Sequence, residues 1–81
     1  MPTHFLGADA LTAGIPVYRL FAEAGLAASN GEARRLIRGA GARINDLVVT
    51  DENRVFTRAD FVGDSAKLSA GKKQHRLIRQ K

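Results

Sequence analysis

The stretch of sequence that decides the fold runs Ser29-Asn30-Gly31-Glu32-Ala33-Arg34-Arg35-Leu36-Ile37-Arg38-Gly39-Ala40-Gly41. Ser29 can accept a hydrogen bond from a first-turn amide while Glu32 reaches back to the N–H of Ser29, which is the pattern of a capping box. The apolar positions that follow recur at helical spacing and form one stripe: Ala33, Leu36, Ile37 and Ala40. Gly39 and Gly41 are suited to end this helix. The stretch therefore predicts a helix from about Asn30 to about Arg38.

A first helix is predicted just upstream, from Pro16 to about Gly25. Pro16 suits a first helical turn and Gly25 suits a helix stop. The apolar residues between them again follow helical spacing: Val17, Leu20, Phe21 and Ala24. Two helices joined by a short connection are expected to pack against each other.

Beyond Gly41 the pattern changes to short strand-like pieces separated by turn residues. The predicted strands are 42–45, 47–50, 55–56, 66–69 and 75–79, with the last two forming a hairpin. The expected fold is α+β, with two packed N-terminal helices followed by a small, mostly antiparallel sheet over residues 15–81. Residues 1–14 lack periodicity and contain Pro2, Gly7 and Gly14, so they are expected to be a linker or lead-in from an upstream domain.

Length and composition narrow the class of protein. The chain has 81 residues and is 44% apolar, which fits one domain with one small core. It has no cysteine, so disulfides and thiolate-bound zinc are excluded and a reducing cytoplasm is the expected location. No apolar run approaches the roughly 20 residues of a membrane span, and no targeting segment opens the chain. We therefore expect a soluble, untargeted chain with no partner inside a membrane.

Charge is the most informative bulk property. The 13 Lys and Arg residues outnumber the 8 Asp and Glu residues, giving a net charge of +5. The excess is concentrated after residue 33, where all the basic residues except Arg19 lie. A basic excess confined to one part of a domain indicates a polyanionic partner, with nucleic acid the first expectation and an anionic membrane surface the second.

Three arginines of the predicted second helix share one exposed arc. At 100° per residue, Arg34, Arg35 and Arg38 lie within about 100° of one another, opposite the apolar stripe. Charged helix faces often serve only solubility, but these arginines have no acid three or four residues away within the helix. Guanidinium groups match phosphate oxygens bidentately, so the arc predicts a contact with a phosphate backbone.

A second basic segment follows the helix. Arg43 begins it, and residues 71–81 hold five Lys or Arg residues and no acid. A solvated tail is the alternative, but Leu77 and Ile78 indicate a packed strand. The candidate nucleic-acid-binding residues of this segment are Lys72, Lys73, His75, Arg76 and Arg79.

No catalytic or metal site is predicted. His4 and His75 lack cysteine or carboxylate neighbours at metal-ligand spacing. A catalytic triad could be assembled from Ser29, His75 and Asp60, but no sequence motif supports it. Gly71 lacks the glycine-rich lead-in of a nucleotide-binding loop. We expect no cofactor and no metal, and no enzyme activity from this chain in isolation.

Two segments resemble a known family. Residues 24–37 and 39–45 resemble the S-four RNA-binding fold, which is shared with pseudouridine synthases and ribosome-associated proteins. Residues 67–79, from Lys67-Leu68-Ser69-Ala70-Gly71 to Leu77-Ile78-Arg79, resemble the C-terminus of bacterial tyrosyl-tRNA synthetases. Together the two matches cover about residues 15–81.

The resemblance implies a domain that follows the synthetase's other domains and contacts the anticodon stem and long variable arm of tyrosine tRNA. The implied RNA face comprises the helix start, the arginine arc and the basic hairpin: Ser29, Asn30, Arg34, Arg35, Arg38, Arg43, Lys72, Lys73, His75, Arg76 and Arg79. Gly31 departs from the basic or longer polar residue that relatives often carry. The synthetase's ATP-binding signatures are absent from the chain.

Two alternatives remain open. A free-standing protein of the same fold would act on ribosomal RNA. A DNA-binding helix-turn-helix would use the same two helices, although the strands after Gly41 argue against it.

Overall fold

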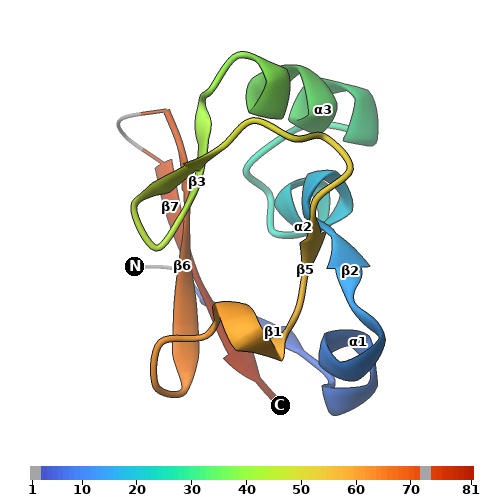
Figure 1. Ribbon diagram of the computed structural model, residues 1–81, viewed down its shortest axis with the longest axis vertical. Helices are drawn as coiled ribbons and strands as arrows, with labels where there is room; N and C mark the ends of the chain where they lie inside the picture. Colours follow the sequence, from blue (N-terminus) through green and yellow to red (C-terminus); the bar gives the residue numbers. More distant parts are fainter. Residues whose placement is uncertain (1–2, 72–73) are drawn as a thin grey trace.

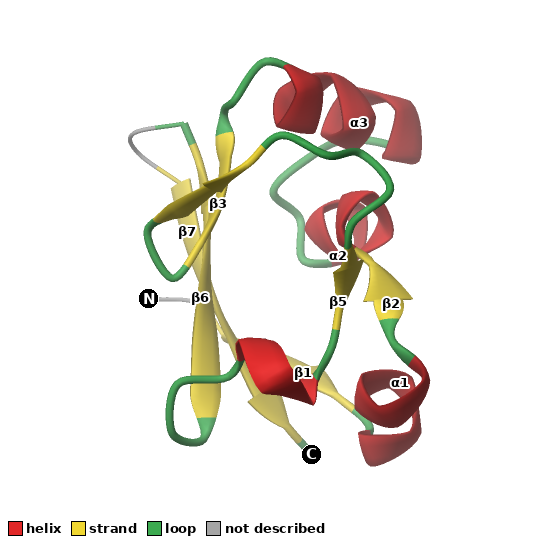
Figure 2. Ribbon diagram, viewed as in Figure 1, coloured by secondary structure: helices red, strands yellow, loops and turns green. Residues whose placement is uncertain are grey.

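The computed structural model describes residues 3–71 and 74–81. Helices and a small two-stranded sheet cover one face of a five-stranded sheet (Figures 1 and 2). The large sheet has the strand order β1-β7-β6-β3-β4. Its strands are β1 (Thr3–Leu6), β3 (Ala42–Ile44), β4 (Leu47–Val49), β6 (Ser65–Ala70) and β7 (Gln74–Gln80). The α+β class predicted from the sequence is confirmed.

The other elements lie on the covered face of this sheet (Figure 2). They are α1 (Ala8–Ala13), β2 (Ile15–Pro16), α2 (Val17–Glu23), α3 (Asn30–Arg38), β5 (Val55–Phe56) and the 3₁₀ turn η1 (Arg58–Asp60). α2 and α3 pack against each other, and β2 pairs with β5. Both predicted helices are therefore present, and α3 has the predicted bounds. At its start the Ser29 hydroxyl accepts from the Glu32 N–H at 3.2 Å.

The two helices end in the same hydrogen-bonding pattern, with different residues at the critical position. After α2, Gly25 adopts a φ of +83°, and the Leu26 N–H donates to the Phe21 carbonyl. After α3 the left-handed position is filled by Ala40, with a φ of +62°, and not by a glycine. Gly41, the next residue, is needed for a steric reason and not for its φ. A Cβ at this position would lie 2.6 Å from Cδ1 of Leu36.

Local turns set the register of the sheet. Asn45 and Asp46 join β3 to β4 in a two-residue turn, both with positive φ (51° and 70°). The Asn45 amide donates to the Asp60 carbonyl at 2.7 Å and its oxygen accepts from the Lys67 N–H at 2.9 Å. One side chain therefore ties the hairpin to η1 and to β6. The predicted hairpin of the last two strands is also present as β6 and β7.

Residues 3–14, expected to be a linker or lead-in, carry β1 and α1. β1 runs parallel to β7, with Thr3 opposite Leu77. Leu6 and Leu11 are buried in the core, with exposed fractions of 6% and 1%. Local signals for these elements are weak, because α1 has only six residues and no side-chain cap. Contacts distant in sequence stabilise them.

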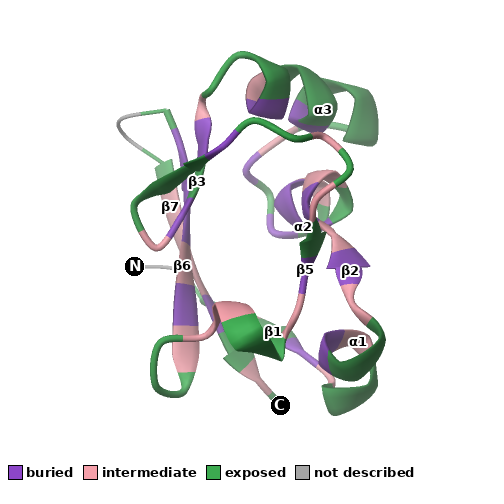
Figure 3. Ribbon diagram, in the orientation of Figure 1, coloured by how far each residue is buried: buried purple, intermediate pink, exposed green. Residues whose placement is uncertain are grey.

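The core lies between the large sheet and the helices (Figure 3). Its largest fully buried side chains include two aromatic rings, and α3 contributes Ala33 and Ile37 to it. Leu36, on the same predicted stripe, is only half-buried at the margin of the core. Within the described residues, no helix has both the length and the apolar character needed to cross a bilayer.

Candidate nucleic-acid interface

The first candidate surface is the exposed side of α3. Because Ala33 and Ile37 are buried, the helical period turns Arg34, Arg35 and Arg38 toward solvent, and all three are exposed. We call this set the α3 basic face. Ser29 and Asn30 lie at the start of the same helix and are also exposed. The structure thus brings five of the predicted RNA-binding residues together on one element.

Arg34 has a defined position on this face. Its guanidinium carbon lies 4.2 Å from the centre of the Tyr18 ring, which belongs to α2. Such a cation–π contact orients the side chain without neutralising its charge. A guanidinium held in this way loses less conformational entropy when it binds an anion.

Arg38 has an acidic neighbour that the helix sequence does not reveal. The loop between β4 and β5 brings Glu52 to Arg38, with Oε2 3.2 Å from Nε. The pair is exposed to solvent, so its contribution to stability is small. It nevertheless places a carboxylate beside the α3 basic face, where an anionic ligand has to compete with it.

The second candidate surface is the uncovered face of the large sheet. In β3 the side chains of Ala42 and Ile44 are buried, so strand alternation turns Arg43 to the other face of the sheet. In β7 it likewise turns His75 and Arg79 to the face away from the buried Ile78. Arg43 pairs across the sheet with Ser69, and Ser69 pairs with His75. We call this surface the outer sheet face.

Three residues of the outer sheet face, His75, Arg79 and Lys67, have polar partners. The Ser69 hydroxyl lies 3.0 Å from Nδ1 of His75. Arg79 lies 2.9 Å from the Asp64 carboxylate. Lys67, which the sequence reading missed, also belongs to this face and lies 3.2 Å from Asp46. Its place between the buried Ala66 and Leu68 is the alternation signal that would have revealed it.

Arg76 points the other way, toward the helices. Its Nε donates to the Ala24 carbonyl at 3.0 Å and its Nη1 donates to the His75 carbonyl at 2.9 Å. The Ala24 carbonyl lies at the C-terminal end of α2, where backbone acceptors lack partners within the helix. Arg76 therefore joins β7 to α2. The remaining predicted residues, Lys72 and Lys73, lie outside the described residues.

A further ion pair closes the segment 54–60, which contains β5 and η1. Arg54 and Asp60 approach to 2.6 Å, and the Asp60 carboxylate also accepts from the Thr57 N–H. Burial acts to raise the pKa of Asp60, but hydrogen bonds from Arg54 and the Thr57 N–H outweigh it and leave that pKa below its usual value. The hydrogen bond to Asp60 raises the pKa of Arg54. This pair is structural.

Across residues 3–71 and 74–81 we find no group of three or more His, Cys, Asp or Glu side chains placed to hold a metal ion. The fold and its surfaces define a small basic α+β domain with exposed basic residues on α3 and on the outer sheet face. No family model matches the chain.

Comparison with curated proteins identifies the relatives. The chain is 54% identical over 79 residues to tyrosine–tRNA ligase of Gluconobacter oxydans, covering 98% of this chain and 19% of that protein. It is 54% identical over 81 residues to the ligase of Rickettsia rickettsii, with 98% and 20% covered. The ligase of Rhodospirillum rubrum is 49% identical over 79 residues, with 98% and 19% covered.

The chain therefore matches the C-terminal region of bacterial tyrosine–tRNA ligases along nearly its whole length. It spans about one fifth of the length of these relatives.

Proposed function

We propose that this chain is a tRNA-binding domain of a tyrosine–tRNA ligase and that the α3 basic face is its principal RNA contact. The observation that carries the proposal is the position of Arg34, Arg35 and Arg38, exposed together opposite a buried stripe. The similarity to tyrosine–tRNA ligases supplies the context, because such an enzyme acts on tRNA.

The chemistry of the face suits a phosphate backbone. Guanidinium groups donate paired hydrogen bonds to phosphate oxygens, and contacts of this kind set the position of the protein on the nucleic acid. Arg34 is oriented by Tyr18. Arg35 makes no ion pair with any residue in the described part of the chain. Its charge is therefore available to a ligand.

The outer sheet face would contribute to the proposed interface through Arg43 and His75, and Lys72 and Lys73 remain part of it by sequence. By resemblance, the RNA is tyrosine tRNA and the contacts fall on its anticodon stem and long variable arm. Residues 15–81, the predicted RNA-binding unit, fold together with β1 and α1, and this domain would follow upstream synthetase domains that activate tyrosine in the cytoplasm.

The test is the affinity of Arg35→Ala for tyrosine tRNA, measured by titration at several salt concentrations. Loss of one phosphate contact should weaken binding several-fold and lower the salt slope by about one unit. Arg19→Ala is the matched control, since Arg19 is an exposed helical arginine on α2 that pairs with Glu23. Unchanged binding by Arg35→Ala, or an equal loss with Arg19→Ala, would contradict the proposal. A tRNA that lacks the variable arm then tests the finer assignment.

A further inference from the structure

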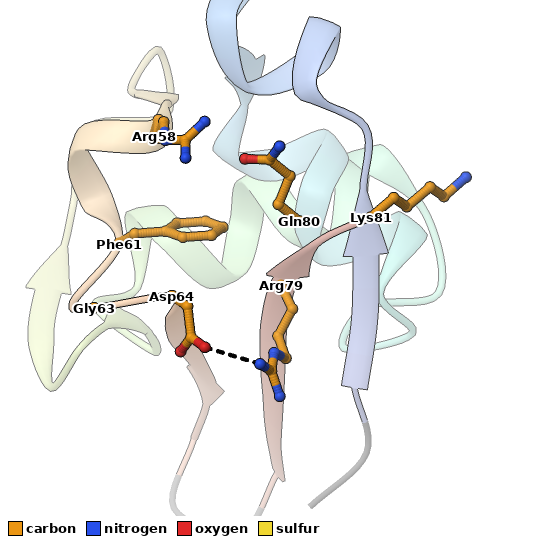
Figure 4. Close-up of a pocket in the computed structure, with 7 residues that line it drawn as sticks. All are labelled: Arg58, Phe61, Gly63, Asp64, Arg79, Gln80 and Lys81. Carbon is orange, nitrogen blue, oxygen red and sulfur yellow. Dashed lines mark hydrogen bonds and ion pairs between the residues drawn. The ribbon is translucent and has the colours of Figure 1, made fainter.

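A pocket of about 380 Å³ lies between η1 and the C-terminal end of β7 (Figure 4). Arg58 comes from η1, Phe61 follows it, and Gln80 comes from the end of β7. In Figure 4 the Arg58 guanidinium and the Gln80 amide extend toward each other above the Phe61 ring. The oxygen of the Gln80 amide is the atom nearer Arg58 (Figure 4), so a donor and an acceptor from distant parts of the chain face one space beside an aromatic ring.

The charge of the pocket is positive. Arg79 lines it but is occupied by Asp64, at 2.9 Å. Arg58 is exposed and has no ion pair among the described residues. Asp60, the acid of its own 3₁₀ turn, is held by Arg54 at 2.6 Å. The guanidinium of Arg58 is thus left uncompensated at the pocket mouth.

The position of the pocket separates it from the α3 basic face. η1 and the end of β7 lie toward the opposite end of the molecule's longest axis from α3 (Figure 1). The extent of the molecule along this axis is 29 Å. A ligand group in the pocket therefore cannot be the one that α3 contacts.

We propose that this pocket binds a phosphodiester group of the bound RNA, with its phosphate at Arg58 and its ribose against Phe61 and Gln80. These groups fit the ligand because a guanidinium donates to phosphate oxygens and an amide oxygen accepts from a ribose hydroxyl. Phe61 offers the apolar surface that a sugar face requires. The inference rests on the proposed function and adds a second contact at the far end of the domain.

The experiment compares three variants of the chain in titrations with a tyrosine tRNA transcript. Arg58→Gln should weaken binding several-fold and lower the salt slope by about one unit, as expected for one lost phosphate contact. Arg58→Lys should retain part of the affinity, because a point charge remains. Arg19→Gln removes the same charge from α2 and should bind like the parent. Thermal melts should match for all three, since both arginines are exposed.

Arg35→Ala distinguishes failure of the pocket from failure of the proposed function. If Arg58→Gln binds like the parent while Arg35→Ala binds weakly, the pocket assignment is overturned and an acidic protein segment becomes the alternative occupant. An equal loss with Arg19→Gln also overturns it, because the effect would then be one of total charge. If neither Arg58→Gln nor Arg35→Ala weakens binding, the proposed function itself fails. Fold-losses that multiply in the Arg35→Ala, Arg58→Gln double variant would support two separate contacts.

Discussion

The Glu52 carboxylate lies 3.2 Å from the Arg38 guanidinium, so an acid of the β4–β5 loop occupies part of the α3 basic face. An exposed ion pair of this kind is worth about 0.5–1 kcal/mol. Glu52→Gln should therefore strengthen tRNA binding about twofold to fivefold by releasing Arg38. Isothermal titration at low salt measures the change. Asp51→Asn removes the same charge one residue away and should have less effect. Equal gains would indicate total charge instead of release of Arg38.

Arg76 should affect stability more than RNA binding. Its guanidinium joins β7 to the end of α2 through the Ala24 carbonyl. Loss of a charge-assisted hydrogen bond costs about 1.5–3 kcal/mol. Arg76→Ala should lower the free energy of unfolding by that amount in chemical denaturation. Arg79→Ala, which breaks only an exposed pair with Asp64, should cost less than about 1 kcal/mol. Similar losses for the two variants would refute the linking role of Arg76.

Two neighbouring core positions of α3 should differ in their sensitivity. Ile37 is fully buried, whereas Leu36 lies at the margin of the core. Ile37→Ala should cost about 2–5 kcal/mol and bring so small a domain close to unfolding. Leu36→Ala should cost less, because part of its side chain already contacts water. Denaturant melts of the two variants test this order, and a larger loss for Leu36→Ala would show that the packed face has been misassigned.

Much of the fold follows from local signals, and the exceptions have a common cause. The α3 cap, the helical periodicities and the hairpin residues each act within a few positions, so α2, α3 and strands β3–β7 could be predicted. β1 and α1 could not, because Leu6 and Leu11 are buried by elements far along the chain. Their stability is tertiary and leaves no periodic pattern in the sequence.

The same distinction applies to the candidate site. Helical geometry was enough to predict that Arg34, Arg35 and Arg38 are exposed together. The partners of Arg38 and Arg76 were not predictable, because Glu52 and Ala24 lie 14 and 52 residues away. Arg58 gave no signal at all, since its setting depends on how η1 meets the end of β7.

At low pH the contribution of Asp60 to the stability of the fold should be lost. Its pKa is lowered in the folded protein, against the effect of burial, by hydrogen bonds from Arg54 and the Thr57 N–H. A lowered pKa stabilises the fold above the ordinary value of 3.8, and this stabilisation is lost as pH falls through the lowered value. Asp60→Asn should be less stable than the parent at pH 7, and the difference should shrink below about pH 4. Unfolding free energies measured across this range test the prediction, and a constant difference would contradict it.

Ala40 offers a stabilising change. Its φ of +62° lies in the left-handed region, which glycine adopts without the steric cost that a Cβ brings. Ala40→Gly should raise the free energy of unfolding by about 0.5–1 kcal/mol. A rise in melting temperature with unchanged RNA binding is the expected result. A lower melting temperature would show that the entropy lost by glycine on folding outweighs the relief.

The parallel pairing of β1 with β7 has a consequence for folding during translation. β7 is the shared neighbour of β1 and β6, so the N-terminal strand has no hydrogen-bonded partner in the sheet until residues 74–80 are present. Pairing between such distant segments also carries a loop-closure cost and slows folding. A nascent chain paused before β7 leaves the ribosomal exit tunnel should therefore hold β1 unpaired. The sheet can therefore be completed only after this region has been translated.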